Sequence, residues 1–248
     1  MTSRFRIIAG PNGSGKTTLT EWLQRDYAVN FYHRLNADDI FAEVKVSHAT
    51  RAPLPVENAH LVRYAEASGY QPETIQCFTG GTIHAEGDII RFASDDDINS
   101  YTVALVTNFL QAELIAAGLS FSQETVFSHV SKVDALAAAK AVGFRTYLYF
   151  VATEKPSVNL ARVASRYAAG GHDVPPEKVM SRYARSLANV RRALPYVSRA
   201  YFFDNGGTDM RYLASWSAED GFALHCATDV LPKWFLNSVY NPLNEELT

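Results

Sequence analysis

Short apolar runs alternate with stretches of helical periodicity along most of the chain. The apolar runs predict strands near residues 5–9, 31–36, 120–126, 145–151 and 199–203. Between them, apolar positions three or four residues apart predict helices near 16–26, 101–117, 131–142, 157–168 and 176–194. Strands that alternate with helices are typical of a parallel sheet covered on both faces. The pattern therefore predicts an α/β fold with a doubly wound, mostly parallel sheet.

Two regions depart from this alternation. Towards the end of the chain, "MRYLASW" and "FALHCAT" predict a hairpin, and residues 229–240 predict a short closing helix. Residues 46–98 contain "RAPLP", "FTGGTIHAEGD" and "SDDD", with weak periodicity and many turn formers. Connections in compact domains usually run about 4–6 residues. We therefore expect one domain over 1–248, with an insertion at about 46–98 that has some structure of its own.

The insertion ends in a group of acids, namely Glu86, Asp88, Asp95, Asp96 and Asp97. Carboxylates gathered in this way either bind a cation or form a solvated acidic loop. A charge run is usually a solvated surface, so the sequence favours the loop.

The first strand leads into a glycine-rich segment that is typical of phosphate binding. Residues 10–17 read GPNGSGKT and match the Walker A pattern G-x-x-x-x-G-K-[ST]. "FRIIAG" before it predicts a strand, and "KTTLTEWLQRDY" after it predicts a helix. Glycines let successive N–H groups turn towards phosphate oxygens, and the helix N-terminus adds partial positive charge. The candidate ATP-binding residues are Gly10, Pro11, Asn12, Gly13, Ser14, Gly15, Lys16, Thr17 and Thr18.

Within this P-loop, Lys16 is expected to reach the β- and γ-phosphates, and Thr17 to ligate Mg2+. Motifs of other P-loop classes are missing. No N-K-x-D occurs, which disfavours a GTPase, and the strand "TYLYFV" continues into Ala152 and Thr153 rather than an Asp-Glu pair. A kinase remains, because it must hold a second substrate against the γ-phosphate.

A kinase also needs a base for the acceptor hydroxyl, and "LNADDI" after the second strand offers two carboxylates. Ends of neighbouring parallel strands meet at one edge of a sheet. Asp38 is favoured as the base. Asp39 is then a helix cap, a first-turn charge or a contact to the acceptor, and the reverse assignment stays open.

The third strand carries Glu124 in "FSQETVFSH". A carboxylate in an apolar run is costly unless it has a partner. Glu124 therefore either binds substrate hydroxyls or a Mg2+-bound water at the strand end, or pairs with a structural arginine. His129 and Lys132 are expected to be surface or helix-start residues.

Positive charge gathers between residues 156 and 199, in an otherwise slightly acidic protein. This segment holds seven arginines and one lysine against two acids, a local formal charge of +6. Two predicted helices flank the turn "AGGHDVPP". The helices and this turn together predict a lid at about 157–194 that closes over phosphates. Arg162 and Arg166 share a helical face, as do Arg182 and Arg185. Arg191, Arg192 and Arg199 are read as an exposed basic face.

Several of these motifs, in this order, resemble the zeta-toxin-like P-loop kinases of bacterial toxin–antitoxin systems. The similar segments are "AGPNGSGKTTL", "NADDI", "SQETVFSHVSKVDALAAAKAVGFRTYLYFVATEKPSVNLARVASR", "GGHDVPPEKVMSRYARSLANV" and "YFFDN", which cover most of 1–45 and 101–205. The resemblance implies a small-kinase fold and transfer of the γ-phosphate of ATP to the 3′-hydroxyl of the amino sugar in UDP-N-acetylglucosamine.

The resemblance also implies roles for residues. Lys16 and Thr17 match the nucleotide and Mg2+ residues, Asp38 the base, and Glu124 a substrate-binding carboxylate. Arg162 or Arg166 matches the first of two arginines around the transferred phosphate. The second family arginine has no direct counterpart, and either His172 or Arg182 stands in for it. The insertion at 46–98 is also outside the family pattern.

Composition is that of an ordinary globular protein, with 20% charged and 47% apolar residues and a formal net charge of −3. This balance does not favour generic nucleic-acid binding. Two distant cysteines, no membrane-length apolar stretch and no signal-peptide pattern predict a cytoplasmic protein. The expected partners are a small-molecule acceptor, foremost a nucleotide sugar, and a separate antitoxin chain. The alternatives are a kinase for another metabolite, nucleoside, protein or RNA hydroxyl, and a nucleotide-binding switch without an acceptor.

Overall fold

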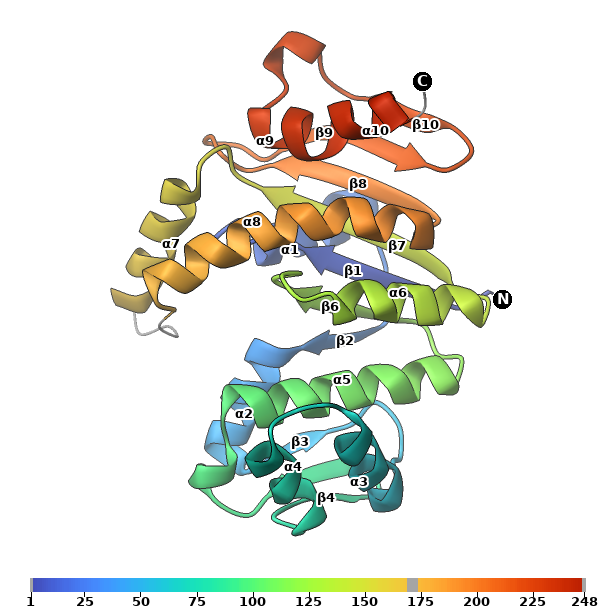
Figure 1. Cartoon of the computed structure of the whole chain (residues 1–248), viewed down its shortest axis with the longest axis vertical. Helices are drawn as coiled ribbons and strands as arrows, with labels where there is room; N and C mark the ends of the chain where they lie inside the picture. The colour runs from blue at the N-terminus through green and yellow to red at the C-terminus, as the bar shows by residue number, and fades with distance from the viewer. Residues whose placement is uncertain (1, 169–173, 247–248) are drawn as a thin grey trace. The chain divides into compact units, whose positions relative to one another are not determined.

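The computed structural model describes residues 2–168 and 174–246, with side chains up to residue 243 (Figure 1). The chain forms two compact units. The larger unit joins the residues up to Phe31 with those from Ser122 onward, and the smaller unit is Tyr32–Phe121. Within the described ranges, no helix is both long and apolar enough to cross a membrane.

The larger unit carries most of the strands and the glycine loop. Its strands are β1 (Arg4–Ala9), β6 (Phe121–Thr125, whose first residue belongs to the smaller unit), β7 (Arg145–Ala152), β8 (Arg199–Asp204), β9 (Arg211–Ser217) and β10 (Gly221–Leu224). Its helices are α1 (Lys16–Tyr27), α6 (Ser131–Ala141), α7 (Pro156–Ala168) and α8 (Pro176–Ala193), with the short helices α9 (Lys233–Phe235) and α10 (Asn241–Glu246) joined by a π-helix (Leu236–Tyr240). Single 3-10 turns lie at Leu194–Tyr196 and Thr228–Val230.

The smaller unit contains β2 (His33–Asn36), α2 (Ala37–Ser47), β3 (Ala49–Arg51), α3 (Asn58–Ala67), α4 (Pro72–Thr79), β4 (Ile83–Glu86), β5 (Ile89–Phe92), a 3-10 turn (Asp95–Asp97) and α5 (Ser100–Ala116). The strands β3, β5 and β4 form an antiparallel sheet in that order. The helix α5 contacts α2, α3 and α4, and most of its apolar side chains are buried. The insertion therefore contains a sheet and two helices, although its sequence has only weak periodicity.

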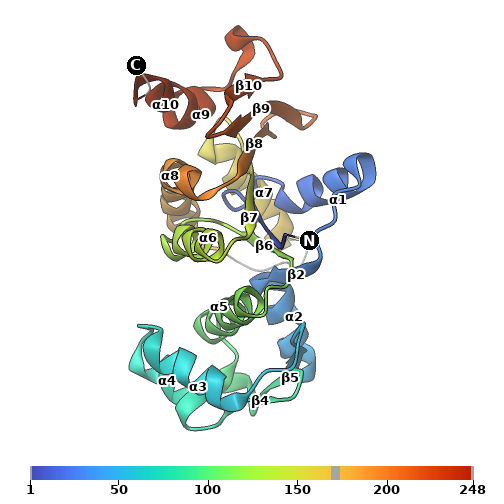
Figure 2. The same ribbon diagram turned by 90° about the vertical axis from the view of Figure 1, so that its right-hand side faces the viewer.

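Among the described residues of the larger unit, the central sheet has the strand order β10-β9-β8-β7-β1-β6. The strand β7 pairs in parallel with both β1 and β8, whereas β9 and β10 continue the sheet antiparallel. In the larger unit, α1 lies on one face of this sheet, and α6 and α8 lie on the other (Figure 2). The expected α/β class with a mostly parallel, doubly covered sheet is confirmed, and so is the terminal hairpin.

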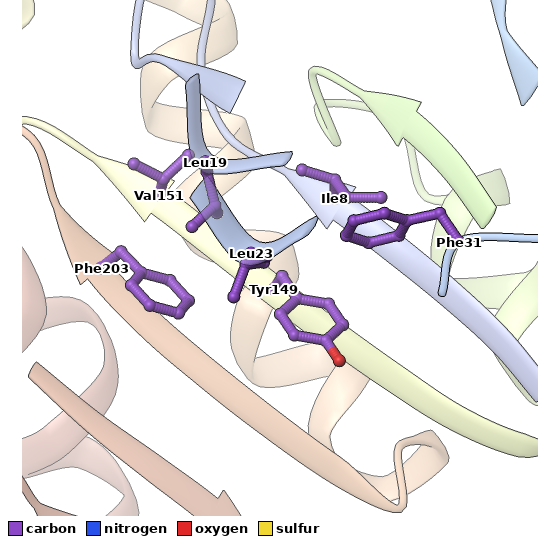
Figure 3. Packing of buried hydrophobic residues seen from close by; sticks show 7 residues of the cluster. All are labelled: Ile8, Leu19, Leu23, Phe31, Tyr149, Val151 and Phe203. Carbon is purple, nitrogen blue, oxygen red and sulfur yellow. The ribbon is translucent and has the colours of Figure 1, made fainter. Parts of the chain in front are cut away.

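The core beneath α1 fixes this helix, and with it the glycine loop, on the sheet. Leu19 and Leu23 point from α1 towards Ile8, Tyr149 and neighbouring side chains of β1, β7 and β8 (Figure 3). Leu19 is fully buried. Burying a leucine or isoleucine side chain contributes about 1.5–3 kcal/mol. This packing sets the direction from which α1 and its N-terminus approach the loop.

The acids of the insertion are used within the smaller unit. The Asp97 carboxylate is buried and accepts hydrogen bonds from Thr82 and Ser94, so that it caps its own 3-10 turn. Asp88 pairs with Arg51, Glu86 with Arg91, and Asp95 with His48. The expectation of a solvated acidic loop is therefore wrong for Asp97. Across the described residues, no group of three or more potential ligands is arranged for a metal ion.

A buried carboxylate anchors the C-terminal segment to the end of β8. Asp204, only 3% exposed, accepts from Trp234 Nε1 at 2.9 Å and from Arg211 Nη2 at 3.0 Å. We expect Asp204→Ala to lower the free energy of unfolding by about 2–4 kcal/mol, because it leaves the Trp234 indole N–H and Arg211 Nη2 without the carboxylate that accepts from them. Urea denaturation measures this loss. Asp209→Ala, at an exposed position of the following loop, is the control and should change stability by about 0.5 kcal/mol or less.

Candidate functional site

The GPNGSGKT segment folds as a tight loop between β1 and α1. Gly13 and Gly15 have φ angles of +74° and +94°, which side chains other than glycine rarely adopt. A Cβ atom on Gly10 would lie 2.1 Å from the Val151 carbonyl oxygen, so the backbone of β7 excludes a side chain there. The loop backbone thus takes the compact form that the pattern predicts.

The start of α1 supplies donors for an anion. Gly15 is the N-cap residue and has no side chain to cap the helix, so the first-turn N–H groups are left for a ligand. Lys16 Nζ lies 3.1 Å from the Gly10 carbonyl and 3.3 Å from that of Pro11. The lysine ammonium is therefore held over the loop itself, where a phosphate chain would lie.

The serine of the loop is also placed for a polar ligand. Ser14 is fully buried, and within the described part of the chain its hydroxyl has no hydrogen-bond partner. A buried hydroxyl without a partner is costly. With the glycine conformations and Lys16, this hydroxyl fits the phosphates of a nucleotide.

The end of β6 lies beside the beginning of α1. Thr17 Oγ1 lies 3.5 Å from Glu124 Oε1, at the outer limit of a hydrogen bond. A hydroxyl and a carboxylate are oxygen ligands of the kind that Mg2+ prefers, directly or through water. Thr17 and Glu124 therefore fit a magnesium ion next to the phosphates.

The first predicted lid helix also contacts the loop. Arg162 is half-buried on α7, and its Nη1 lies 3.5 Å from the Gly13 carbonyl oxygen. Arg166 is exposed one turn further along α7, and Arg182 is half-buried on α8. Arg162 is therefore the lid arginine with a contact to the loop among the described residues. His172 lies outside the described residues.

Two further residues contact the loop that the sequence did not single out. Asn159 Nδ2 donates to the Asn12 carbonyl at 2.6 Å, and Asn205 Nδ2 donates to the Ser14 carbonyl at 2.9 Å. Asn159 lies three residues before Arg162 on the same helical face, but this spacing does not indicate that its amide contacts the loop. Asn205 ends the "YFFDN" segment, directly after β8.

Asp38 and Asp39 belong to the smaller unit and are described within it. Both are exposed in the first turn of α2. The N-cap is Asn36, whose Oδ1 accepts from the Asp38 backbone N–H at 3.0 Å. Asp39 is therefore a first-turn charge and not the cap, and neither carboxylate is needed to begin the helix. Their roles towards base and acceptor stay predictions.

His129 and Lys132 were expected at the surface or at the start of a helix, and both lie there. His129 is exposed. Lys132 lies in the first turn of α6 and is half-buried, and burial lowers the pKa of its ammonium to about 8.

Gly13→Ala should disrupt the loop by two separate effects. Alanine is strained at a φ of +74°, and its Cβ would lie 2.7 Å from the Asn159 carbonyl oxygen. We expect a loss of about 1–3 kcal/mol of stability, and ATP binding weakened about tenfold or more. Thermal denaturation and calorimetric titration with ATP measure the two effects.

Gly143→Ala is the matched control for Gly13→Ala. Gly143 has a φ of +89°, but a Cβ there would have no atom within 4 Å. It should reproduce the backbone strain without weakening ATP binding. If both variants bind ATP equally well, the close approach of α7 to the loop has no role in binding.

Comparison with known proteins supports the fold. No protein-family model and no curated protein matches the sequence. Among solved structures, the PezAT chromosomal toxin–antitoxin system of Streptococcus pneumoniae matches with a TM-score of 0.53 and 14% identity, over 99% of this chain and 88% of that one. The AvrRxo1-ORF1:AvrRxo1-ORF2 complex with sulphate ions gives 0.52 and 14%, and the complex with ATP gives 0.53 and 14%; in both, all of this chain matches.

These similarities define the class of fold. The chain spans 64% of the matched chain of the AvrRxo1 complexes. The matches show an α/β fold that this chain shares with these proteins, and the loop between β1 and α1 has the Walker A sequence and its glycine conformations. The matched structures come from toxin–antitoxin proteins, and this chain shares their overall fold.

Proposed function

We propose that the protein is an ATP- and Mg2+-dependent kinase of the zeta-toxin type. Its acceptor is a hydroxyl of UDP-N-acetylglucosamine or a related nucleotide sugar. The observation that carries the proposal is the P-loop, with Lys16 over its backbone and with Thr17, Glu124 and Arg162 at its rim. Carboxylate and arginine groups beside such a loop suit phosphoryl transfer, which needs positioning and charge neutralisation.

In the proposed reaction, the acceptor oxygen bonds to the γ-phosphorus while the bond between that phosphorus and the ADP oxygen breaks. Asp38 takes the hydroxyl proton as general base. Lys16 and the arginines Arg162 and Arg166 stabilise the charge on the transferred group. Mg2+, when bound, neutralises phosphate charge, with Thr17 as its ligand. Asp39, Glu124, Arg182 and His172 are the proposed contacts to the acceptor and its product.

The neighbours add support for the substrate and for a partner. One AvrRxo1 complex was solved with ATP, and the PezAT structure belongs to a toxin–antitoxin system. We therefore propose ATP as the phosphate donor and a separate antitoxin chain as a regulator of this protein. We propose that it acts in the cytoplasm, where ATP is supplied.

Incubation with ATP, Mg2+ and UDP-N-acetylglucosamine tests the proposal. Mass spectrometry should show a sugar nucleotide with one added phosphate, and omission of Mg2+ should abolish it. An active enzyme that leaves this sugar nucleotide unchanged but phosphorylates a nucleoside or another metabolite would move the acceptor to that class. ATP binding without any phosphorylated product would instead favour a nucleotide-dependent switch.

A further inference from the structure

The outer side of the P-loop is held by two side-chain amides from different elements. Asn159, on α7, donates to the Asn12 carbonyl at 2.6 Å, and Asn205, after β8, donates to the Ser14 carbonyl at 2.9 Å. Each contact joins residues far apart in the sequence. The two carbonyls lie two residues apart, on alternate peptide units of the loop.

Each amide is itself fixed in place. Asn159 is fully buried, and its Oδ1 accepts from the Thr153 hydroxyl, which orients the amide so that Nδ2 faces the loop. Asn205 donates its backbone N–H to the Ala152 carbonyl at 2.8 Å. A Cβ on Gly15 would lie 2.1 Å from Asn205 Nδ2, so glycine is required for this approach. Both contacts are therefore built into the packing of β7, α7 and β8 around the loop.

The direction of a carbonyl determines the direction of the N–H in the same peptide unit. In a trans peptide these two groups point to opposite sides. The Asn12 carbonyl faces Asn159, so the Gly13 N–H is turned away from that side chain. The Ser14 carbonyl faces Asn205, so the Gly15 N–H is likewise turned away.

Peptide units next to glycine rotate more freely than others, because glycine populates many backbone conformations. Without an outer partner, the Gly13 and Gly15 N–H groups would have to be ordered when phosphate binds, which weakens binding. A fixed carbonyl partner removes this cost in advance.

We propose that Asn159 and Asn205 are positioning residues that orient the Gly13 and Gly15 N–H groups for bound phosphates. The inference rests on the proposed function, because it assumes that the loop binds a nucleotide. It assigns the two asparagines to phosphate affinity and not to the acceptor or the base.

Leucine substitutions test this role, since leucine is close in size to asparagine and equally uncharged but has no hydrogen-bond donor. Asn159→Leu and Asn205→Leu should each weaken binding of ATP and of inorganic tripolyphosphate about five- to tenfold. The double variant should lose about 30-fold. Asn205→Gln, which keeps an amide donor, should retain part of the affinity. Isothermal titration gives the dissociation constants.

Asn189→Leu is the matched control. Asn189 is 3% exposed, and its Nδ2 donates to the Phe127 carbonyl at 3.0 Å, outside the P-loop. The Asn189→Leu variant also loses a hydrogen bond from a side-chain amide to a backbone carbonyl. Its melting temperature should therefore fall, while its ATP affinity stays near that of the wild type. If Asn159→Leu does not fold, the partly exposed Asn205 decides the question.

The outcomes separate the two proposals. Wild-type protein that binds ATP, together with asparagine variants that bind it no more weakly than Asn189→Leu does, overturns the positioning role alone. Wild-type protein that binds neither ATP nor tripolyphosphate contradicts the proposed function, and the positioning role with it. Weaker binding of both ligands in Asn159→Leu and Asn205→Leu, beyond the change in Asn189→Leu, supports the inference.

Discussion

Asp38→Asn is expected to lower kcat by about 10²–10⁴-fold, the range that loss of a general base usually gives. The amide has the same shape as the carboxylate but cannot take the acceptor proton. The fold should tolerate the change, because Asp38 is exposed and the cap of α2 is Asn36, which uses only the Asp38 backbone N–H. ATP affinity should also stay close to that of the wild type. Steady-state kinetics with UDP-N-acetylglucosamine measure the effect.

Asp39→Asn is the natural comparison, because Asp39 is the next residue and equally exposed in the same turn. We expect it to raise KM for the acceptor with a smaller change in kcat, as loss of a binding contact does. The opposite pattern in the two variants would exchange the roles of the aspartates. Full activity in Asp38→Asn would remove Asp38 from the mechanism.

Lys16→Ala should be the most damaging change in the loop. The ammonium lies 3.1 Å and 3.3 Å from two loop carbonyls, in the place where it can meet the phosphates. Removing one group that stabilises transition-state charge typically costs about 10²–10³-fold in kcat. ATP binding should weaken as well, since the same charge attracts the ground-state phosphates. Calorimetric titration with ATP and initial rates separate these two effects.

The control for Lys16→Ala is Lys140→Ala. Lys140 lies in the last turn of α6, and its Nζ donates to the Pro195 carbonyl at 2.7 Å, away from the loop. It removes a lysine charge and one lysine-to-carbonyl hydrogen bond without touching the P-loop. Equal loss of ATP binding in both variants would mean that net charge, rather than the position of Lys16, controls affinity.

Much of this architecture could be predicted from the sequence, because it depends on local patterns. Alternating apolar runs and helical periodicity gave the strands and helices of the larger unit. Gly13 and Gly15 predicted positive φ angles, which glycine adopts readily. The same motif identified Lys16 and Thr17 as candidate phosphate and Mg2+ residues. Such signals act over a few residues, so they can be read without knowledge of the tertiary structure.

Contacts between distant segments could not be predicted in this way. Asn159 and Asn205 bind loop carbonyls that precede them by well over a hundred residues, and no spacing rule links a side-chain amide to a remote carbonyl. The burial of Asp97 was missed partly for the same reason, since Thr82 lies 15 residues before it, although its capping partner Ser94 is only 3 residues away. The sheet β3-β5-β4 went unseen because its strands are only three or four residues long.

The fate of the γ-phosphate of ATP tests the central claim most directly. The protein is incubated with γ-labelled ATP, Mg2+ and a cytoplasmic metabolite extract. The amounts of label in organic products and in inorganic phosphate are then measured. We predict that wild-type protein moves the label onto an alcohol, foremost that of a nucleotide sugar, and that Asp38→Asn does not. Label that stays in ATP, or that is released only as inorganic phosphate, would contradict the account.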